Sequence, residues 1–138
     1  MRTYERKLDG QVFNFRLSVG AQKAMEKKFG EPAMQTVLAA AMDTERMTYL
    51  LGAAANYRGN ENPTTDGEEI YDLMVDDGVC GQEDFLKEAC MIANASGIVR
   101  DEDAKRILSG VREYMDDVFN SFGEMGPTQT EPEKSDGS

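Results

Sequence analysis

Carboxylates are the main side chains in this sequence that could do acid–base chemistry, because the chain has 26 Asp and Glu residues and no His. They form adjacent groups at 76–77, 83–84, 101–103 and 116–117. Two carboxylates held close together can serve as general acid and base. These groups fall mostly at the ends of expected helices, where capping and the helix dipole explain the N-terminal ones. The chain also lacks Gly-x-Ser-x-Gly, P-loop and Gly-x-Gly-x-x-Gly motifs, so we expect a non-enzymatic protein that binds no cofactor.

The cysteines and a polar loop do not predict a metal site. Cys80 and Cys90 are ten residues apart, and without a Cys-x-x-Cys pair or any His they lack the ligand spacing of a zinc site. The segment from Asn62 matches the first half of a calcium-binding loop, but its twelfth position is Leu73, where a bidentate Glu is needed. We expect both thiols to be small buried groups in a reducing cytosol.

Methionine is common in this chain, with nine residues, and most of them fall in expected helices. Met can fill gaps in a core, or it can form an adaptable apolar groove that accepts many helix faces. Both interpretations stay open at this stage. The last expected helix has an apolar stripe that could dock on the core, self-associate or cover such a groove until a client displaces it. The candidate partner-binding residues of these segments are Met34, Met42, Met47, Met74, Met91, Ile107, Val111, Met115 and Phe119.

Charge is unevenly distributed along the chain, whose net charge is −11. Residues 1–30 contain seven basic and three acidic residues, a net charge of +4, whereas residues 31–138 contain eight and 23, a net charge of −15. Such acidity argues against general binding to nucleic acid or to an anionic membrane. Lys23, Lys27 and Lys28 are candidates for contact with an acidic patch on a neighbouring copy. The sequence contains no run of 18 apolar residues, so we expect no membrane-spanning helix. The N-terminus lacks the pattern of an export signal, so we do not expect export.

The elements that must position these side chains begin with a β-hairpin over residues 4–17. Asp9-Gly10 is a strong two-residue turn signal, and with this turn the numbers of facing residues sum to 19. One face of the hairpin then collects apolar side chains and the other presents polar ones. The expected apolar face consists of Tyr4, Leu8, Phe13, Phe15 and Leu17, and the polar face of Glu5, Lys7, Asn14 and Arg16.

Helical patterns follow from residue 18 to residue 122. Ser18 is a good N-cap for the first helix and Gly30 a good residue to end it. Apolar stripes predict further helices at about 32–42, 43–59, 65–78 and 82–96, the third of these beginning with a capping box at Thr65 and Glu68. Asp101 is expected to cap a sixth helix, 101–122, which could be semi-independent of the rest.

The sequence therefore predicts an α+β fold that is mostly α, with an N-terminal β-hairpin packed on a bundle of about five to six helices. The hairpin must lay its aromatic face on helices, because an isolated two-stranded hairpin is marginally stable. We expect residues 1–122 to form a single globular domain. Residues 123–138 change in composition to Gly, Pro, Thr, Glu and Ser, which is typical of a disordered acidic tail.

Three segments resemble the tail assembly chaperones of long-tailed (siphovirus-type) bacteriophages and prophages. The first is Phe15–Gly30, in which a strand leads into a helix that ends Met-Glu-Lys-Lys-Phe-Gly. The second is Ile-Tyr-Asp-Leu-Met at 70–74, followed by Asp76 and Asp77, and the third is Ala-Asn-Ala-Ser-Gly-Ile at 93–98. The resemblance covers roughly residues 4–98 in order.

This resemblance implies a non-enzymatic protein that binds the tape measure protein, prevents its aggregation and helps recruit tail tube subunits. It also implies action in the cytoplasm of the bacterial host and absence from the mature virion. Two other functions stay open. A structural connector would be present in purified phage particles. An acidic DNA-mimic inhibitor would need carboxylates along one continuous face, whereas here we expect them at the ends of elements.

Overall fold

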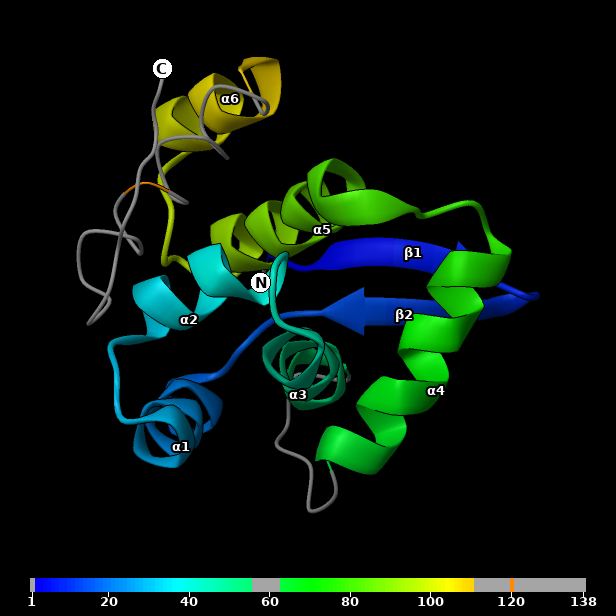
Figure 1. Ribbon diagram of the computed structural model, residues 1–138, viewed down its shortest axis with the longest axis horizontal. Helices are drawn as coiled ribbons and strands as arrows, with labels where there is room; N and C mark the ends of the chain where they lie inside the picture. The colour runs from blue at the N-terminus through cyan, green and yellow to red at the C-terminus, as the bar shows by residue number, and fades with distance from the viewer. Residues whose placement is uncertain (1, 56–62, 111–119, 121–138) are drawn as a thin grey trace, which may run out of the picture.

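The computed structural model describes residues 2–55, 63–110 and 120 of the 138-residue chain. These residues form an antiparallel two-stranded sheet and six helices, which confirms the predicted α+β fold that is mostly α. Figure 1 shows helix α3 (Thr44–Ala54) nearly end-on at the centre, with α1 (Val19–Phe29) and α2 (Ala33–Ala40) on one side and α4 (Pro63–Asp76) on the other. Helix α5 (Gly81–Ala95) runs along the hairpin, and α6 (Asp101–Ser109) lies beyond α5.

Strands β1 (Tyr4–Leu8) and β2 (Gln11–Phe15) pair in the predicted register. The turn residues Asp9 and Gly10 both have positive φ angles, 49° and 78°, as a type I′ turn requires. The hairpin lays its apolar face on the helices, as predicted, because the following residues are buried or half-buried: Tyr4, Leu8, Phe13, Phe15 and Leu17.

Helix α3 is the central element of the core. Every residue from 47 to 55 is buried, and the chain after the helix pairs with the edge of β2. The backbone N–H of Arg16 donates to the carbonyl of Ala54 at 2.9 Å, which closes the sheet edge next to the helix. One apolar cluster joins all the elements and includes Leu8, Phe15, Met25, Val37, Leu50, Ile70, Leu86 and Ile107.

Helices α3 and α4 touch backbone to backbone at two glycines. A Cβ atom built on Gly67 would lie 1.6 Å from the carbonyl oxygen of Thr48, and one built on Gly52 would lie 1.7 Å from that of Pro63. No side chain fits in either space, so the two helices pack this closely only because both positions are glycine. This contact fixes the position of α4 on the core.

The C-terminal end of α5 is tied to the end of the hairpin by buried and half-buried hydrogen bonds. The backbone N–H of Leu17 donates to the Ser96 hydroxyl at 2.8 Å, and that hydroxyl donates to the Ile92 carbonyl at 2.6 Å. The Arg16 guanidinium donates to the Ala95 carbonyl at 2.8 Å. Residues 15–17 and 95–96, which are far apart in the sequence, are therefore neighbours.

Several predicted helix boundaries are wrong. Helix α2 ends at Ala40, two residues before the predicted end. Helix α3 ends at Ala54, because Ala55 adopts an extended conformation to bridge Phe15, so the predicted end at residue 59 is not reached. Helix α4 begins at Pro63, which places Thr65 inside the helix instead of at a capping box. Proline suits the first turn of a helix because its missing N–H has no helical partner there.

The predicted continuous helix 101–122 is also wrong. Helix α6 ends at Ser109, and Gly110 has φ −124° and ψ 43°, which is not helical. Glycine is a poor residue for a helix interior, so the helical conformation is interrupted at Gly110. The prediction failed because it followed the spacing of apolar residues in the sequence across this glycine. The predicted tail 123–138 lies outside the described residues.

Candidate partner-binding surfaces

The structure divides the candidate apolar residues between core and surface. Three of them are buried and cannot contact a partner in this conformation, namely Met47, Met74 and Ile107. Met42 and Met91 are half-buried, and Met34, in the first turn of α2, is the one exposed residue among the described apolar candidates. The described methionines therefore mostly fill the core and do not line one continuous groove. Val111, Met115 and Phe119 lie outside the described residues.

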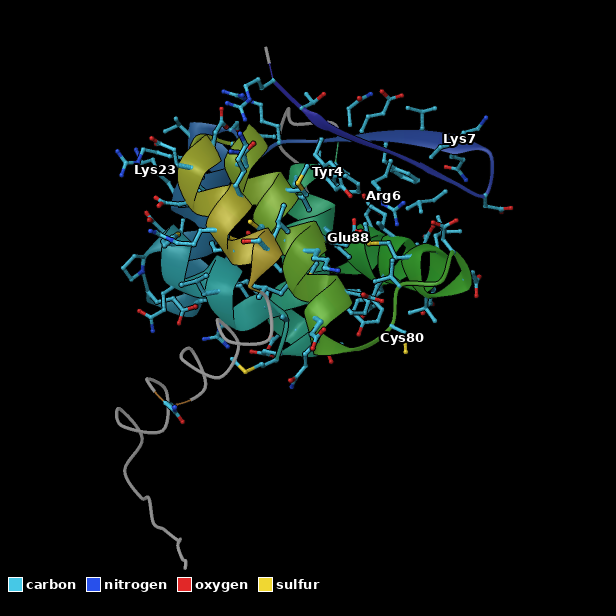
Figure 2. The ribbon with its side chains drawn as sticks, turned by 90° about the horizontal axis from the view of Figure 1, so that it is seen from above. Tyr4, Arg6, Lys7, Lys23, Cys80 and Glu88 are labelled. Atoms are coloured by element: carbon cyan, nitrogen blue, oxygen red, sulfur yellow. The ribbon has the colours of Figure 1, made fainter. Side chains whose placement is uncertain are left out.

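Two of the three candidate lysines share an exposed face of α1. Lys23 and Lys27 are one helical turn apart, and Val19, one turn earlier, has 72% of its surface exposed. We call these three residues the basic face. Figure 2 shows Lys23 pointing outward from α1 at the edge of the molecule. Neither lysine forms an ion pair with another described residue.

Lys28 differs from its two neighbours because it packs against aromatic rings. Its Nζ atom lies 5.6 Å from the ring centres of both Phe29 and Tyr49, which meet edge-to-face at 5.4 Å. The Arg46 guanidinium lies 4.9 Å from the Phe29 ring. Cation–π contacts of this kind hold the end of α1 on α3. Lys28 thus has a structural contact, whereas Lys23 and Lys27 face solvent.

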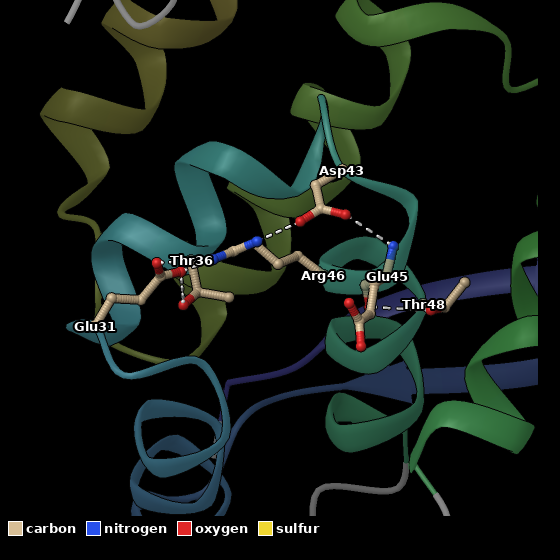
Figure 3. Close-up of polar contacts among 6 residues, drawn as sticks. All are labelled: Glu31, Thr36, Asp43, Glu45, Arg46 and Thr48. Carbon is tan, nitrogen blue, oxygen red and sulfur yellow. Dashed lines mark hydrogen bonds and ion pairs between the residues drawn. The ribbon is translucent and has the colours of Figure 1, made fainter. Parts of the chain in front are cut away.

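An ion-pair network fixes the turn between α1 and α2 on the start of α3 (Figure 3). Arg46 binds both carboxylate oxygens of Glu31, at 2.8 and 2.9 Å, and also pairs with the N-cap residue Asp43. The Thr36 hydroxyl donates to Glu31 at 2.5 Å. Hydrogen bonds from Arg46 lower the pKa of Glu31, and the Glu31 side chain is only 10% exposed. The network therefore holds the turn after α1 against the start of α3.

A second polar cluster joins the hairpin to α5. Figure 2 shows Tyr4 and Arg6 directed toward Glu88, where the Tyr4 hydroxyl donates at 2.9 Å and the Arg6 Nε at 3.1 Å. Arg6 also reaches Asp77 at 3.3 Å. Burial, followed by the nearby Glu88 charge, raises the pKa of Tyr4. These groups satisfy one another, so the cluster supports the fold of the hairpin on α5.

Carboxylates also line the outer side of α4. Glu68, Asp72 and Asp76 are exposed and one helical turn apart, and none of them pairs with a described residue. We call them the acidic row. Val75, beside the row, is 48% exposed. The expectation that acidic residues cluster at the ends of elements does not hold for α4, and the spacing of residues 68, 72 and 76 could have revealed this row.

A small hollow lies between β2 and α4, with a volume of about 150 Å³. Its apolar lining includes Phe13, Ile70 and Leu73, and the carboxylates Asp66 and Glu69 also line it. Val12, the β2 residue before Phe13, is 52% exposed. A space of this size holds about one aromatic side chain and is below the usual range for a small-molecule site. The sequence offered no signal for the hollow, because it depends on how the hairpin meets α4.

The residues that the structure describes include neither a metal-binding cluster nor a membrane-spanning helix. No group of three or more Cys, Asp and Glu residues is placed to hold a metal ion. None of the described helices combines the length and apolar character needed to cross a membrane. No protein-family model, curated protein or solved structure matches this chain.

Proposed function

We propose that this protein is a tail assembly chaperone of a long-tailed bacteriophage or prophage. It binds the tape measure protein, keeps the apolar helices of that protein from aggregating, and helps to recruit tail tube subunits. It acts without catalysis in the cytoplasm of the bacterial host, and it is released before the virion is complete. The proposal is based on the three sequence segments that resemble this family.

One structural observation supports treating these segments as a unit. The first segment, 15–30, includes the end of β2 and all of α1, and the third, 93–98, ends α5. They meet through the hydrogen bonds from Leu17 to Ser96 and from Arg16 to Ala95, at 2.8 Å each. The second segment lies in α4, where Tyr71 stacks on Phe85 of α5 at 4.5 Å. Residues that resemble the family thus take part in the contacts that join the hairpin, α4 and α5.

The hollow between β2 and α4 is the surface that we assign to the client. Its apolar lining can accept one large apolar side chain from the stripe of a client helix. Asp66 and Glu69 can attract basic residues that flank such a stripe.

Co-expression with the tape measure protein of the same genome tests the proposal. We expect the client to become soluble and to co-purify with several copies of this protein, as measured by pull-down and light scattering. Glu69→Lys should weaken client binding by about tenfold, because it reverses a charge in the hollow. Glu5→Lys is the matched control, since Glu5 is exposed on the opposite face of the hairpin and the charge change is the same.

Each outcome has a distinct meaning. If the client aggregates with the wild-type protein and no complex forms, the chaperone proposal is wrong. If both variants bind the client as the wild type does, the chaperone function stands and the hollow is not the client site. Mass spectrometry of purified phage particles adds an independent check. Absence of the protein is expected for a chaperone, whereas a stoichiometric amount would identify a structural connector.

A further inference from the structure

We propose that copies of this protein associate head to tail, with the basic face of α1 in one copy docked on the acidic row of α4 in the next. The basic face consists of Val19, Lys23 and Lys27, and the acidic row of Glu68, Asp72 and Asp76. This inference goes beyond the proposed function, because it concerns contacts between copies of the chain and can be tested without a client.

Both surfaces carry charge that has no ion-pair partner among the residues that the structure describes. Five of the arginines form ion pairs with described carboxylates, namely Arg2, Arg6, Arg46, Arg100 and Arg106. Lys23 and Lys27 form none, and neither does any member of the acidic row. Helix α4 contains five acidic residues and no basic one, which makes it the natural complement of α1.

The charged residues of the two surfaces also match in spacing along their helices. The charged residues of both surfaces repeat every four residues, which corresponds to about 6 Å along a helix. If the two helices lie antiparallel, Lys23 can face Asp72 while Lys27 faces Glu68. The helix dipoles are then also antiparallel, which is their favourable arrangement.

An exposed valine lies in or beside each charged set. Val19 on α1 is 72% exposed and Val75 on α4 is 48% exposed. In the same antiparallel arrangement Val19 lies opposite residues 75–76, so the two apolar side chains meet at one end of the contact. Burial of both valines adds an apolar contribution that salt does not screen.

Within one molecule, the basic face of α1 and the acidic row of α4 cannot contact each other. Helices α1 and α4 lie on opposite sides of α3 (Figure 1). A contact between two different surfaces of identical copies is heterologous, so an assembly that does not close has one basic face and one acidic row open at its ends. Such assemblies grow into rings or open chains.

A charge-swap experiment tests this arrangement. The first variant, Lys23→Glu with Lys27→Glu, has acidic residues on both surfaces, and the second, Glu68→Lys with Asp72→Lys, has basic residues on both. We expect each variant alone to be monomeric in sedimentation velocity at low salt, where the wild type associates. An equimolar mixture of the two variants should associate again, because each acidic surface then meets a basic one.

The control for net charge is Lys87→Glu with Lys105→Glu, which makes the same charge change at exposed positions of α5 and α6. This variant should associate as the wild type does. The second variant is less negatively charged overall than the wild type, so loss of its association cannot be explained by general repulsion. Wild-type association should weaken at least tenfold between about 50 mM and 500 mM salt, because screening shortens the reach of the ion pairs.

A monomeric wild type at all protein concentrations and low salt would overturn the inference. So would a mixture of the two variants that stays monomeric, or association of either variant alone to the extent of the wild type. Circular dichroism of each variant shows whether it is folded, so that loss of structure is not mistaken for loss of contact. None of these outcomes depends on whether the tape measure protein binds.

Discussion

The close approach of α3 and α4 at Gly67 predicts that Gly67→Ala destabilises the protein. The added Cβ would lie 1.6 Å from the Thr48 carbonyl oxygen, and real Cβ contacts are essentially never shorter than 3.0 Å. Helix α4 must therefore move away from α3 by about 1.4 Å, the difference between these two distances. Neither atom belongs to a side chain that could rotate away, so the packing of the whole helix pair must change.

The magnitude follows from two opposing effects. Replacing Gly by Ala inside a helix stabilises that helix by about 1 kcal/mol. Overpacking a core destabilises it by about 1–3 kcal/mol and sometimes by more, and a backbone clash lies at the upper end because nothing local can relax. We expect a net loss of about 2 kcal/mol in the free energy of unfolding, which lowers the Tm by roughly 7 °C in a domain of this size.

Thermal and urea unfolding followed by far-ultraviolet circular dichroism measures this change. Gly20→Ala is the matched control, because it is the same substitution in a helix and its Cβ would meet only the Ser18 hydroxyl, at 3.9 Å. That variant should be as stable as the wild type or slightly more stable. A Gly67→Ala protein within about 0.5 kcal/mol of the wild type would refute the reasoning, because the α3–α4 contact would then not be as close as described.

Three further predictions concern single residues. The pKa of Glu31 is lowered by Arg46, so its contribution to stability is present above the ordinary glutamate pKa and is lost as the pH falls through the lower folded value. Glu31→Gln should therefore flatten the fall in stability below about pH 5, as measured by urea unfolding at several pH values. The expectation that both thiols are buried is wrong for Cys80, which is exposed in the turn before α5, whereas Cys90 is buried. Burial raises the pKa of Cys90 to about 11, so a thiol reagent at pH 8 should label Cys80 quickly and Cys90 only after unfolding. Gly10→Ala should destabilise the protein by about 1 kcal/mol, because φ at this position is +78°. Equal labelling of the two thiols, an unchanged pH profile for Glu31→Gln, or a neutral Gly10→Ala would contradict these expectations.

The hairpin was predictable from the sequence because its determinants are local. The Asp9-Gly10 turn sets the pairing of neighbouring residues, and the alternation of apolar and polar side chains sets which face is buried. The first helix was equally predictable, because Ser18 caps one end and Gly30 adopts the left-handed conformation at the other. In both cases the interacting groups lie within a few residues of one another.

Helix ends were less predictable where a distant residue decides them. Ala55 leaves the helical conformation to pair with Phe15, which is 40 positions earlier in the sequence. The roles of the methionines were open for the same reason, since their spacing puts them on helix faces without saying what each face meets. Burial of Met47 and Met74 depends on the packing of α3 and α4.

The sequence by itself thus determined the hairpin register, the two caps of α1 and the basic character of that helix, since each depends on interactions between near neighbours. The predicted caps at Thr65 and Asp101 were wrong, because α4 begins at Pro63 and the N-cap of α6 is Arg100. Only the tertiary structure decided which charges stay unpaired and where they lie. Arg46 pairs with Glu31 and Lys28 contacts two aromatic rings, whereas Lys23 is exposed on α1, which lies on the side of α3 opposite α4 (Figure 1). The physical reason is that pairing of long charged side chains requires proximity in space, and helix packing brings these groups together or keeps them apart.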